Sequence, residues 1–363
     1  MNVLSKVLFT SVLLLNTNVI FASDNNKEDN AETSNVQIDD VKVSVVGTWS
    51  MLSQYKQFER PFWSETITEN SNGAVIADVK GFNEMGLKGS EVVRLMKSGV
   101  IDFGSTVLGY LAADNPKNEA IDLAGLSPNI ETAKIVSDAY KNELSELYNK
   151  TYDIKLLGLW PYSAQVLFCN VPITGLSDLK GKKIRTSNRT LAEFVGALGG
   201  VGVTMSFGEV VQSLQKGVVD CAITGSMSGY SAKWHEVTTH LYTLPLGWAN
   251  VMHAVSNKAW NKLPKATKNY IEREINGLES GIWKGAAQET EQGIACNTGH
   301  GECQSGEPAN LILVEYTERE SKLLDNILSD HVLPLWAERC GKPCVKKWNE
   351  TIGKAVGKEI ETK

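Results

Sequence analysis

The chain of 363 residues lacks the features that mark several large classes of protein. Its formal net charge is −6 and it has no basic block, so binding to nucleic acid has little electrostatic support. It has no phosphate-binding loop and no dinucleotide fingerprint, and its 5 histidines show no metal-ligand spacing. The sequence therefore predicts no cofactor and no metal site. With 42% hydrophobic and 21% charged residues, the composition is otherwise that of an ordinary globular protein.

Two segments look like catalytic motifs but lack the residues that the chemistry requires. GSMSG, residues 225–229, has Met227 where a nucleophile elbow needs serine. In HEVTTH, residues 235–240, the histidines stand five positions apart, roughly 140° around a helix, so they cannot share one metal ion. The sequence thus predicts no catalytic residue. An exported hydrolase for a carboxylate substrate, with a triad of distant residues, stays open as an alternative.

The N-terminus has the pattern of an export signal. Lys6 precedes an apolar run over residues 7–20, and Ala22 provides a small residue for cleavage. The run is interrupted and shorter than the ~20 apolar residues of a membrane span. We therefore predict a signal peptide over residues 1–22 and a polar, disordered leader over residues 23–38. No cysteine lies near the cleavage point, which excludes a lipoprotein, so the expected location is the periplasm of a Gram-negative bacterium.

The six cysteines agree with export to an oxidising compartment. Four of them form two closely spaced pairs, Cys296–Cys303 and Cys340–Cys344, and each pair can close a short loop as a disulfide. A Cys/His metal site is the alternative, but structural zinc sites prefer two-residue gaps between paired thiolates, which neither pair has. Cys169 and Cys221 lie in apolar, strand-like runs, as buried thiols or bonded to each other.

One pattern occurs twice in the sequence. EVVRLMKSGVIDFGST begins at Glu91 and EVVQSLQKGVVDCAIT begins at Glu209. Both have helical apolar spacing, then a Gly that fits the position just after a helix, and then a β-branched run. The repetition predicts a helix–Gly–strand unit in each half of the chain, and hence two similar lobes. Chance similarity between two α/β turns is the alternative.

Strand-like and helix-like segments alternate along most of the chain. We expect strands at residues 41–49, 74–82, 155–160, 164–171 and 182–187, and helices at 55–66, 190–198, 264–296, 311–337 and 343–357. Such alternation predicts a mainly parallel sheet in each lobe. Ligands of open α/β sheets bind beyond the carboxyl ends of the strands. The candidates are therefore the residues at strand ends: Thr48, Trp49, Ser105, Thr106, Thr186, Ser187 and residues 224–226.

The segment GKKIRTSNRT, residues 181–190, contains one unusual cation. Its lysines fit a solvated turn, but Arg185 lies within an expected strand. From the residues alone, Arg185 is either a ligand-binding arginine or a structural arginine in an ion pair. Trp49 is also notable, because it lies in a Gly-Thr-Trp-Ser turn where a loop residue should be polar. Packing in the core is the alternative for Trp49, as it is for Trp248.

Two consecutive runs, GLSDLKGKKIRTSN (175–188) and EFVGALGGVGVTMSFGEVVQSLQKGVVD (193–220), resemble the solute-binding proteins of TRAP transporters, the DctP family. The shared pattern is a Leu-Lys-Gly-Lys-Lys-Ile-Arg turn and strand, a helix that ends in a glycine pair, and a Leu-Gln-x-Gly-x-Val-Asp unit. The resemblance extends from about Val41 to Trp260. It weakens in the C-terminal part, where the cysteine-bearing loops look like additions.

The resemblance implies an α/β protein with the two-lobed periplasmic-binding-protein fold, crossing hinge strands and a long helix that spans both lobes. With the sequence pattern, it predicts lobe 1 over residues 39–163 and 252–263, lobe 2 over 164–251, the long helix over 264–296, and a helical C-terminal region with cysteine loops over 297–363. It also implies that the protein is not an enzyme. It would capture a small organic acid between the lobes and deliver it to the small and large membrane subunits of a TRAP permease. A binding protein of the ABC or sensory type, with another partner, is the alternative.

In that family a strand arginine pairs with the ligand carboxylate, and Arg185 falls on this position. A guanidinium suits this role because it offers two parallel donors and stays charged. Gln165 replaces a second arginine found in sialic-acid binders, and Thr224 replaces an asparagine that often contacts ligand. Both departures imply a single carboxylate on an apolar or hydroxylated body, such as an aryl, indolyl or sugar acid. The full set of predicted ligand-binding residues is Arg185, Thr224, Ser226, Gln165, Trp49, Phe207, Trp248 and Thr48.

Overall fold

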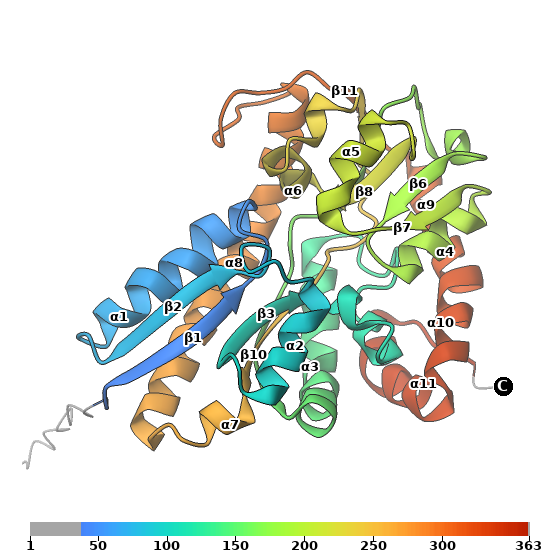
Figure 1. The fold of residues 1–363 in the computed structure, drawn as a ribbon. Coiled ribbons are helices and arrows are strands. Elements are labelled where there is room, and N and C mark those ends of the chain that lie inside the picture. The colour runs from blue at the N-terminus through green and yellow to red at the C-terminus, as the bar shows by residue number, and fades with distance from the viewer. Residues whose placement is uncertain (1–37, 362–363) are drawn as a thin grey trace, which may run out of the picture. The chain divides into compact units, whose positions relative to one another are not determined.

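The computed structural model describes residues 38–361, which contain two β-sheets with helices between successive strands (Figure 1). The expected signal peptide, and all but the last residue of the expected leader, lie outside the described residues. None of the helices described is long and apolar enough to cross a membrane.

The first sheet has the strand order β2-β1-β3-β10-β4. Its strands are β1 (Val41–Gly47), β2 (Val75–Gly81), β3 (Phe103–Val107), β4 (Ile154–Trp160) and β10 (Val251–Ser256). β1 pairs in parallel with β2 and β3, whereas β10 is antiparallel to β3 and β4. In this sheet β10 thus runs opposite to the other four strands, and the chain reaches β10 directly from β9 of the second sheet.

The second sheet has the order β11-β9-β5-β8-β6-β7. Its strands are β5 (Gln165–Cys169), β6 (Lys183–Thr186), β7 (Val201–Thr204), β8 (Cys221–Gly225), β9 (His240–Tyr242) and β11 (Ile312–Val314). Here β5 is the reversed strand, antiparallel to β8 and β9, and the chain enters it from the first sheet. The prediction of mainly parallel sheets is therefore confirmed, with one reversed strand where the chain crosses into each sheet.

Helices pack around both sheets. They are α1 (Ile67–Asn70), α2 (Gly89–Ser98), α3 (Ile130–Tyr152), α4 (Arg189–Ala197), α5 (Val210–Gln215), α6 (Ser226–Ser231), α7 (Asn257–Trp260), α8 (Lys265–Thr298), α9 (Glu318–Ile327), α10 (Leu333–Cys340), α11 (Lys342–Trp348) and α12 (Lys354–Val356). The helix expected from residue 311 was wrong at its start, because residues 312–314 pair with β9 as β11. We call the first sheet with α1–α3 and α7 lobe 1, and the second sheet with α4–α6 lobe 2.

The repeated motif forms the same unit in each lobe. After α2 and after α5, a glycine with positive φ ends the helical turn, 77° at Gly99 and 66° at Gly217, and β3 or β8 follows. In both copies the Asp of the motif accepts a 2.8 Å hydrogen bond from a backbone N–H of a neighbouring strand, Asp102 from β1 and Asp220 from β6. The predicted helix–Gly–strand unit is confirmed, and its aspartate ties the unit into each sheet.

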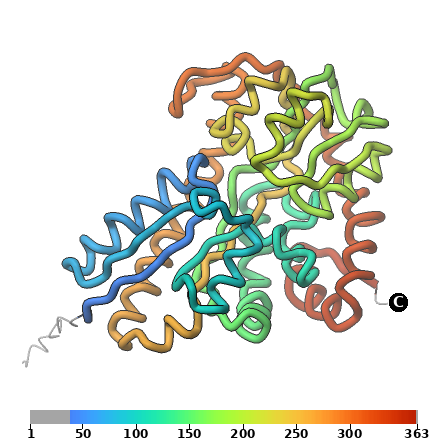
Figure 2. The backbone as a smooth tube through the Cα atoms, viewed as in Figure 1, coloured from blue at the N-terminus to red at the C-terminus, as the bar shows by residue number. Residues whose placement is uncertain are grey.

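Two passes of the chain connect the lobes and lie side by side (Figure 2). The chain crosses from β4 to β5 through residues 161–164 and returns from β9 to β10 through residues 243–250. Between the passes, Tyr162 N donates to Trp248 O at 2.9 Å and Gln165 N donates to Gly247 O at 2.8 Å. Helix α8 also spans both lobes, because it packs against β4 in lobe 1 and against α6 and β9 in lobe 2.

All six cysteines form disulfides. The predicted pairs Cys296–Cys303 and Cys340–Cys344 are confirmed. Cys169 and Cys221 are also bonded; they face each other across the antiparallel pair β5 and β8. Between residues 38 and 361 there is no group of three or more His, Cys, Asp or Glu side chains arranged to hold a metal ion.

Candidate functional site

Two adjoining cavities lie where strand ends of both lobes meet. The inner chamber has a volume of about 30 Å³, and the outer chamber one of about 470 Å³. Both are lined by Trp49, Tyr110 and Ser187, which follow β1, β3 and β6. The chambers thus lie beyond the carboxyl ends of the strands, where ligands of open α/β sheets bind.

Five of the eight predicted ligand-binding residues line the inner chamber: Trp49, Gln165, Arg185, Phe207 and Thr224. They come from β1, β5, β6, β8 and the turn Phe207–Glu209, elements spread over both lobes. The structure therefore brings together residues that are up to 175 positions apart in the sequence, Trp49 and Thr224.

Arg185 is the charged group of the inner chamber, and its side chain is almost completely buried, with 1% exposed. The guanidinium lies over the rings of Phe207 and Trp234, at 5.9 and 5.8 Å from their centroids. Burial lowers the pKa of Arg185 to about 10, and the nearby Tyr110 hydroxyl opposes this shift. A cation in such a place is costly unless an anion accompanies it.

Among the described residues, the protein gives Arg185 no such anion. The arginines of the ion pairs there are Arg273 and Arg339. Instead, Arg185 donates to two backbone carbonyls: Nε and Nη2 bond Met205 O at 3.2 and 3.0 Å, and Nη1 bonds Ile223 O at 2.9 Å. A guanidinium has five N–H donors. One N–H on each terminal nitrogen is therefore left without an acceptor among the described residues.

Trp49 connects the lobes across the chambers. Its indole packs on Phe82 of lobe 1 at a centroid distance of 4.8 Å and on Phe207 of lobe 2 at 5.4 Å. Its Nε1 donates to the hydroxyl of Tyr110 at 3.2 Å. The turn that carries Trp49 is fixed on its other side by Asn83, whose Oδ1 accepts from Ser50 N at 2.9 Å. Trp49 thus packs against core residues and also forms part of the wall of both chambers.

The remaining lining groups are neutral and polar. Gln165 is 2% exposed, its Nε2 contacts Ser187 Oγ at 3.3 Å, and no group of residues 38–361 donates to its Oε1. Thr224 is 5% exposed at the end of β8, and Ser228 follows on α6. The inner chamber therefore offers one cation together with amide and hydroxyl groups.

Three predicted ligand-binding residues do not line either chamber, because each one has a structural partner. Thr48 is fully buried and donates to Glu59 through its backbone N at 2.7 Å and its Oγ1 at 2.8 Å. Ser226 Oγ donates to Thr290 O of α8 at 2.9 Å. Trp248 Nε1 donates to Ser127 O at 2.9 Å. These side chains hold the strand end, helix α6 and the returning pass, respectively.

Two carboxyl groups near the site are buried in the framework. Burial raises the pKa of Glu59 to about 7, against the opposing effect of the two hydrogen bonds from Thr48. Asp122 accepts backbone N–H bonds from Trp248, Ala249 and Asn250 in the returning pass. Ala249 has a left-handed φ of 46° and lines the inner chamber. Asp122 therefore fixes the conformation of the pass at the point where it meets the site.

Two tyrosines that line the inner chamber, Tyr110 and Tyr162, are not among the residues predicted from the sequence. Tyr110 lies on the turn Leu108–Leu111 after β3, and burial raises its pKa, whereas the neighbouring Arg185 lowers it. Tyr162 lies in the first crossing pass, and its hydroxyl has no hydrogen-bond partner in the described chain. For Tyr110 the available signal was its position just after a strand. Tyr162 had none beyond its place between two strands.

The outer chamber differs from the inner one because cationic side chains of both lobes line it. It lies between the N-termini of α2 and α4, and Lys88 and Arg189 line it from lobe 1 and lobe 2. Arg189 is not among the ligand-binding residues predicted from the sequence. Its place in the chamber wall makes it a candidate for contact with the outer part of a ligand.

Comparisons with known proteins agree with this architecture. The family profile "Bacterial extracellular solute-binding protein, family 7", DctP, matches residues 48–300. The C4-dicarboxylate-binding periplasmic protein DctP of Rhodobacter capsulatus is 27% identical over 217 residues, 59% of this chain and 64% of that protein. The ectoine-binding periplasmic protein TeaA of Halomonas elongata is 27% identical over 187 residues, 50% of this chain and 54% of that protein. The chain thus matches less than two thirds of the length of either relative.

Solved structures show the same fold. DctP7, a Bordetella pertussis extracytoplasmic solute receptor binding pyroglutamic acid, has a TM-score of 0.76 at 19% identity and covers 88% of this chain and 100% of its own. A TRAP periplasmic solute-binding protein of Desulfovibrio salexigens with bound orotic acid has a TM-score of 0.75 at 18% identity, with 86% and 99% covered. The predicted two-lobed periplasmic-binding-protein fold is therefore confirmed.

The family match extends over more than half of the chain and includes every residue that lines the two chambers. It also confirms the prediction of a binding protein rather than an enzyme, because the family is one of solute-binding proteins. The chain belongs to the bacterial extracellular solute-binding proteins of family 7, the DctP family.

Proposed function

We propose that this chain is the periplasmic receptor of a TRAP-type importer, which captures a small organic acid and delivers it to the membrane permease. The observation that carries the proposal is Arg185: a buried cation without an acidic partner in the described chain, with two N–H donors left over at a chamber between the lobes. A carboxylate has the charge and the two acceptor oxygens that these donors match. The ligand then supplies the anion that the protein lacks.

The size of the chambers indicates how such an acid would bind. A volume of about 30 Å³ has room for roughly two water-sized groups, which suits a carboxylate on Arg185. The body of the acid then extends past Trp49 and Tyr110 into the outer chamber of about 470 Å³. Two of the neighbouring structures bind pyroglutamic acid and orotic acid, and two others bind succinate, which supports a compact acid with at least one carboxylate.

Binding also gives a reason for the lobes to close. A ligand in the inner chamber would contact residues of both lobes, and it makes all of these contacts only when both lobes surround it. The residues are Arg185 and Thr224 of lobe 2 and Trp49 and Tyr110 of lobe 1. It therefore shifts the population toward the closed arrangement, by as much as its affinities for the two states differ. A permease that recognises the closed arrangement would distinguish loaded from empty receptor.

A thermal-shift screen with organic acids tests the proposal, with each acid paired with its uncharged primary amide. We expect one or more acids to raise Tm and the matching amides to leave it unchanged, because the amide cannot neutralise Arg185. Equal shifts from acid and amide would contradict the carboxylate site.

Recovery of the ligand unchanged after incubation rejects the hydrolase alternative. Neighbouring genes for a small four-helix and a large multi-span membrane protein would support a TRAP partner, and an ATPase gene there would support an ABC partner.

A further inference from the structure

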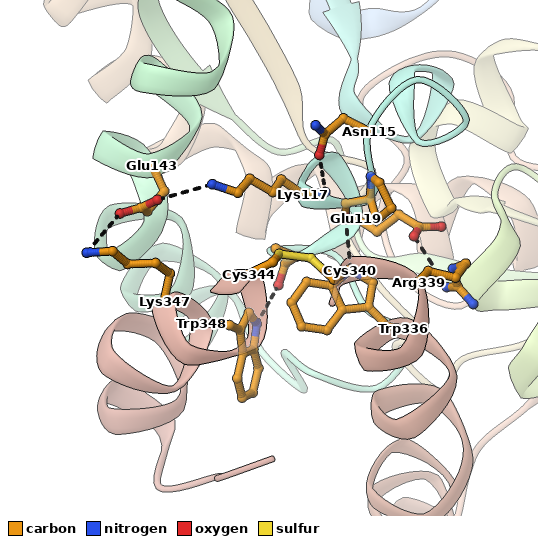
Figure 3. Close-up of a disulfide and its surroundings, with 12 residues drawn as sticks. Asn115, Lys117, Glu119, Glu143, Trp336, Arg339, Cys340, Cys344, Lys347 and Trp348 are labelled. Atoms are coloured by element: carbon orange, nitrogen blue, oxygen red, sulfur yellow. Dashed lines mark hydrogen bonds and ion pairs between the residues drawn. A yellow bond between two sulfur atoms is a disulfide. The ribbon is translucent and has the colours of Figure 1, made fainter. Parts of the chain in front are cut away.

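The C-terminal helices α10 and α11 form an additional connection to lobe 1 around the Cys340–Cys344 disulfide (Figure 3). The Cys340–Cys344 disulfide joins α10 to α11. Both helices are attached to the segment before α3: Trp336 Nε1 donates to Pro116 O at 2.9 Å, and Trp348 Nε1 donates to Ala120 O at 3.1 Å. The two indoles and the disulfide therefore fix α10 on lobe 1.

From this fixed position, Arg339 on the last turn of α10 contacts a carboxylate of each lobe. Its Nη2 lies 3.3 Å from Glu119 of lobe 1 and 3.3 Å from Glu193 on α4 of lobe 2, and its Nη1 also bonds Glu193. The cluster is shielded from solvent, since the exposed fractions of the Arg339, Glu119 and Glu193 side chains are 18%, 2% and 14%. One guanidinium thus pairs with two carboxylates from opposite lobes and balances one of their two negative charges.

The helix held by this contact also carries part of the cleft wall. α4 begins at Arg189, four residues before Glu193, and Ser187, Asn188 and Arg189 line the outer chamber. Because a helix moves as a rigid body, the position of Glu193 sets the position of Arg189, and of Asn188, which caps the helix by accepting from Leu191 N at 2.9 Å. A second hydrogen bond joins α4 to lobe 1, since Thr190 Oγ1 donates to the carbonyl oxygen of Asp122 at 3.4 Å.

We propose that Arg339 is a positioning residue for the binding cleft: by pairing with Glu119 and Glu193 together, it holds α4 against lobe 1 and favours the closed arrangement of the lobes. The inference rests on the proposed function, because its main effect is on ligand affinity. Without the guanidinium, two shielded carboxylates of opposite lobes face each other. Like charges in such a setting repel strongly, so the lobes separate at α4.

The test compares four variants with the wild type: R339M, R339K, E193Q and the double variant R339M/E193Q. Calorimetry gives Kd for the acid found in the screen, and small-angle X-ray scattering gives the radius of gyration without ligand. We expect R339M to weaken binding roughly tenfold or more and to enlarge the radius of gyration. R339M/E193Q should recover part of this loss, since it removes the repulsion, and R339K should stay near the wild type. K347M, which removes a half-exposed cation from α11, is the control and should bind normally.

Other results overturn the inference. If R339M keeps the wild-type Kd and radius of gyration while its Tm falls, Arg339 only stabilises the fold. If E193Q does not restore binding to R339M, repulsion between the carboxylates is not the cause. If R339M does not fold, E193Q alone decides, because it removes the negative charge through which Arg339 holds α4, while Arg339 still pairs with Glu119; normal affinity there overturns the inference. If no acid binds the wild type, the proposed function fails, and the radius of gyration of R339M still decides on Arg339.

Discussion

Replacing Arg185 by methionine removes the proposed carboxylate anchor while keeping an unbranched, apolar side chain in place of the aliphatic part of the arginine. Arg185 has two N–H groups that do not bond Met205 O or Ile223 O, and a carboxylate would accept hydrogen bonds from these two groups. Loss of one partner of a buried charge pair costs about 2–5 kcal/mol of binding. This corresponds to a roughly 30- to 4,000-fold increase in Kd. R185K keeps the charge but not the two parallel donors, so we expect an intermediate loss.

The same substitution should have a much smaller effect on the empty protein. In wild type, burial lowers the pKa of Arg185 to about 10, which shows that the surroundings disfavour its charge. Methionine relieves this cost and at the same time removes three hydrogen bonds. Exchange of buried charged groups for apolar ones is often nearly neutral for stability. We therefore expect the free energy of unfolding of R185M, measured with urea, to change by less than about 2 kcal/mol.

Calorimetric titration of wild type, R185K and R185M, together with the urea curves, separates binding from folding. R273M is the control, because it removes an arginine whose side chain is 69% exposed on α8. Undiminished affinity in R185M would refute the placement of the carboxylate. A large loss of stability without ligand would instead favour the structural alternative for Arg185.

Three further predictions concern the framework. The pKa of Glu59 in the folded protein, about 7, lies above its ordinary value of 4.5, so this carboxyl contributes its full stabilisation below about pH 4.5, and the contribution is lost as pH rises from there to about 7. The free energy of unfolding of the wild type, relative to that of E59Q, should therefore fall between about pH 4.5 and 7, by up to roughly 3 kcal/mol. A pH-independent difference in urea curves would contradict this. Replacing both Cys169 and Cys221 by alanine should lower the free energy of unfolding by about 4 kcal/mol, since this disulfide closes a sequence separation of 52 residues. The loss should be smaller for Cys296–Cys303, which closes a separation of 7 residues. The reverse order would show that loop length does not determine the stabilisation. G293A should lower Tm, because the new Cβ would lie 2.3 Å from the backbone of α6, whereas G277A, which has open space on the same helix, should raise the free energy of unfolding by roughly 0.5–1 kcal/mol; equal effects would show that α6 can move away.

The parts of the fold that follow local rules were predictable from the sequence. The helix–Gly–strand unit depends on apolar spacing, a glycine with positive φ and a β-branched run, all of which lie within about 16 residues in each copy. Arg185 was identifiable because it lies on a strand of a recognisable motif. β11 was missed because its backbone gains hydrogen bonds only from β9, about 70 residues earlier in the chain, and no local pattern records such a pairing.

The site residues show a similar limit. Position after a strand selected Trp49 and Thr224 correctly as lining residues, but it selected Thr48 and Ser226 on equal grounds. The difference depends on partners that are distant in sequence or lie on another element: Glu59 takes up the Thr48 side chain, and a carbonyl of α8 takes up the hydroxyl of Ser226. Strand order therefore predicts which end of a sheet holds a ligand. Tertiary partners decide which side chains there remain free to bind it.

A buried cation without an anion stays desolvated only if the protein around it is rigid. Two of the disulfides contribute to this rigidity. An empty receptor could relieve Arg185 by letting the strands separate and water enter. Cys169–Cys221 opposes this, because it ties β5 to β8, the strands that carry Gln165 and Thr224. Cys340–Cys344 acts at the lobe contact, next to Arg339. If the framework holds Arg185 desolvated, the carboxylate gains the full benefit of neutralising it, so we expect the variant without Cys169–Cys221 to bind the acid more weakly at a temperature where it is fully folded. Equal Kd values for the bridged and unbridged proteins would show that backbone hydrogen bonds alone keep Arg185 in place.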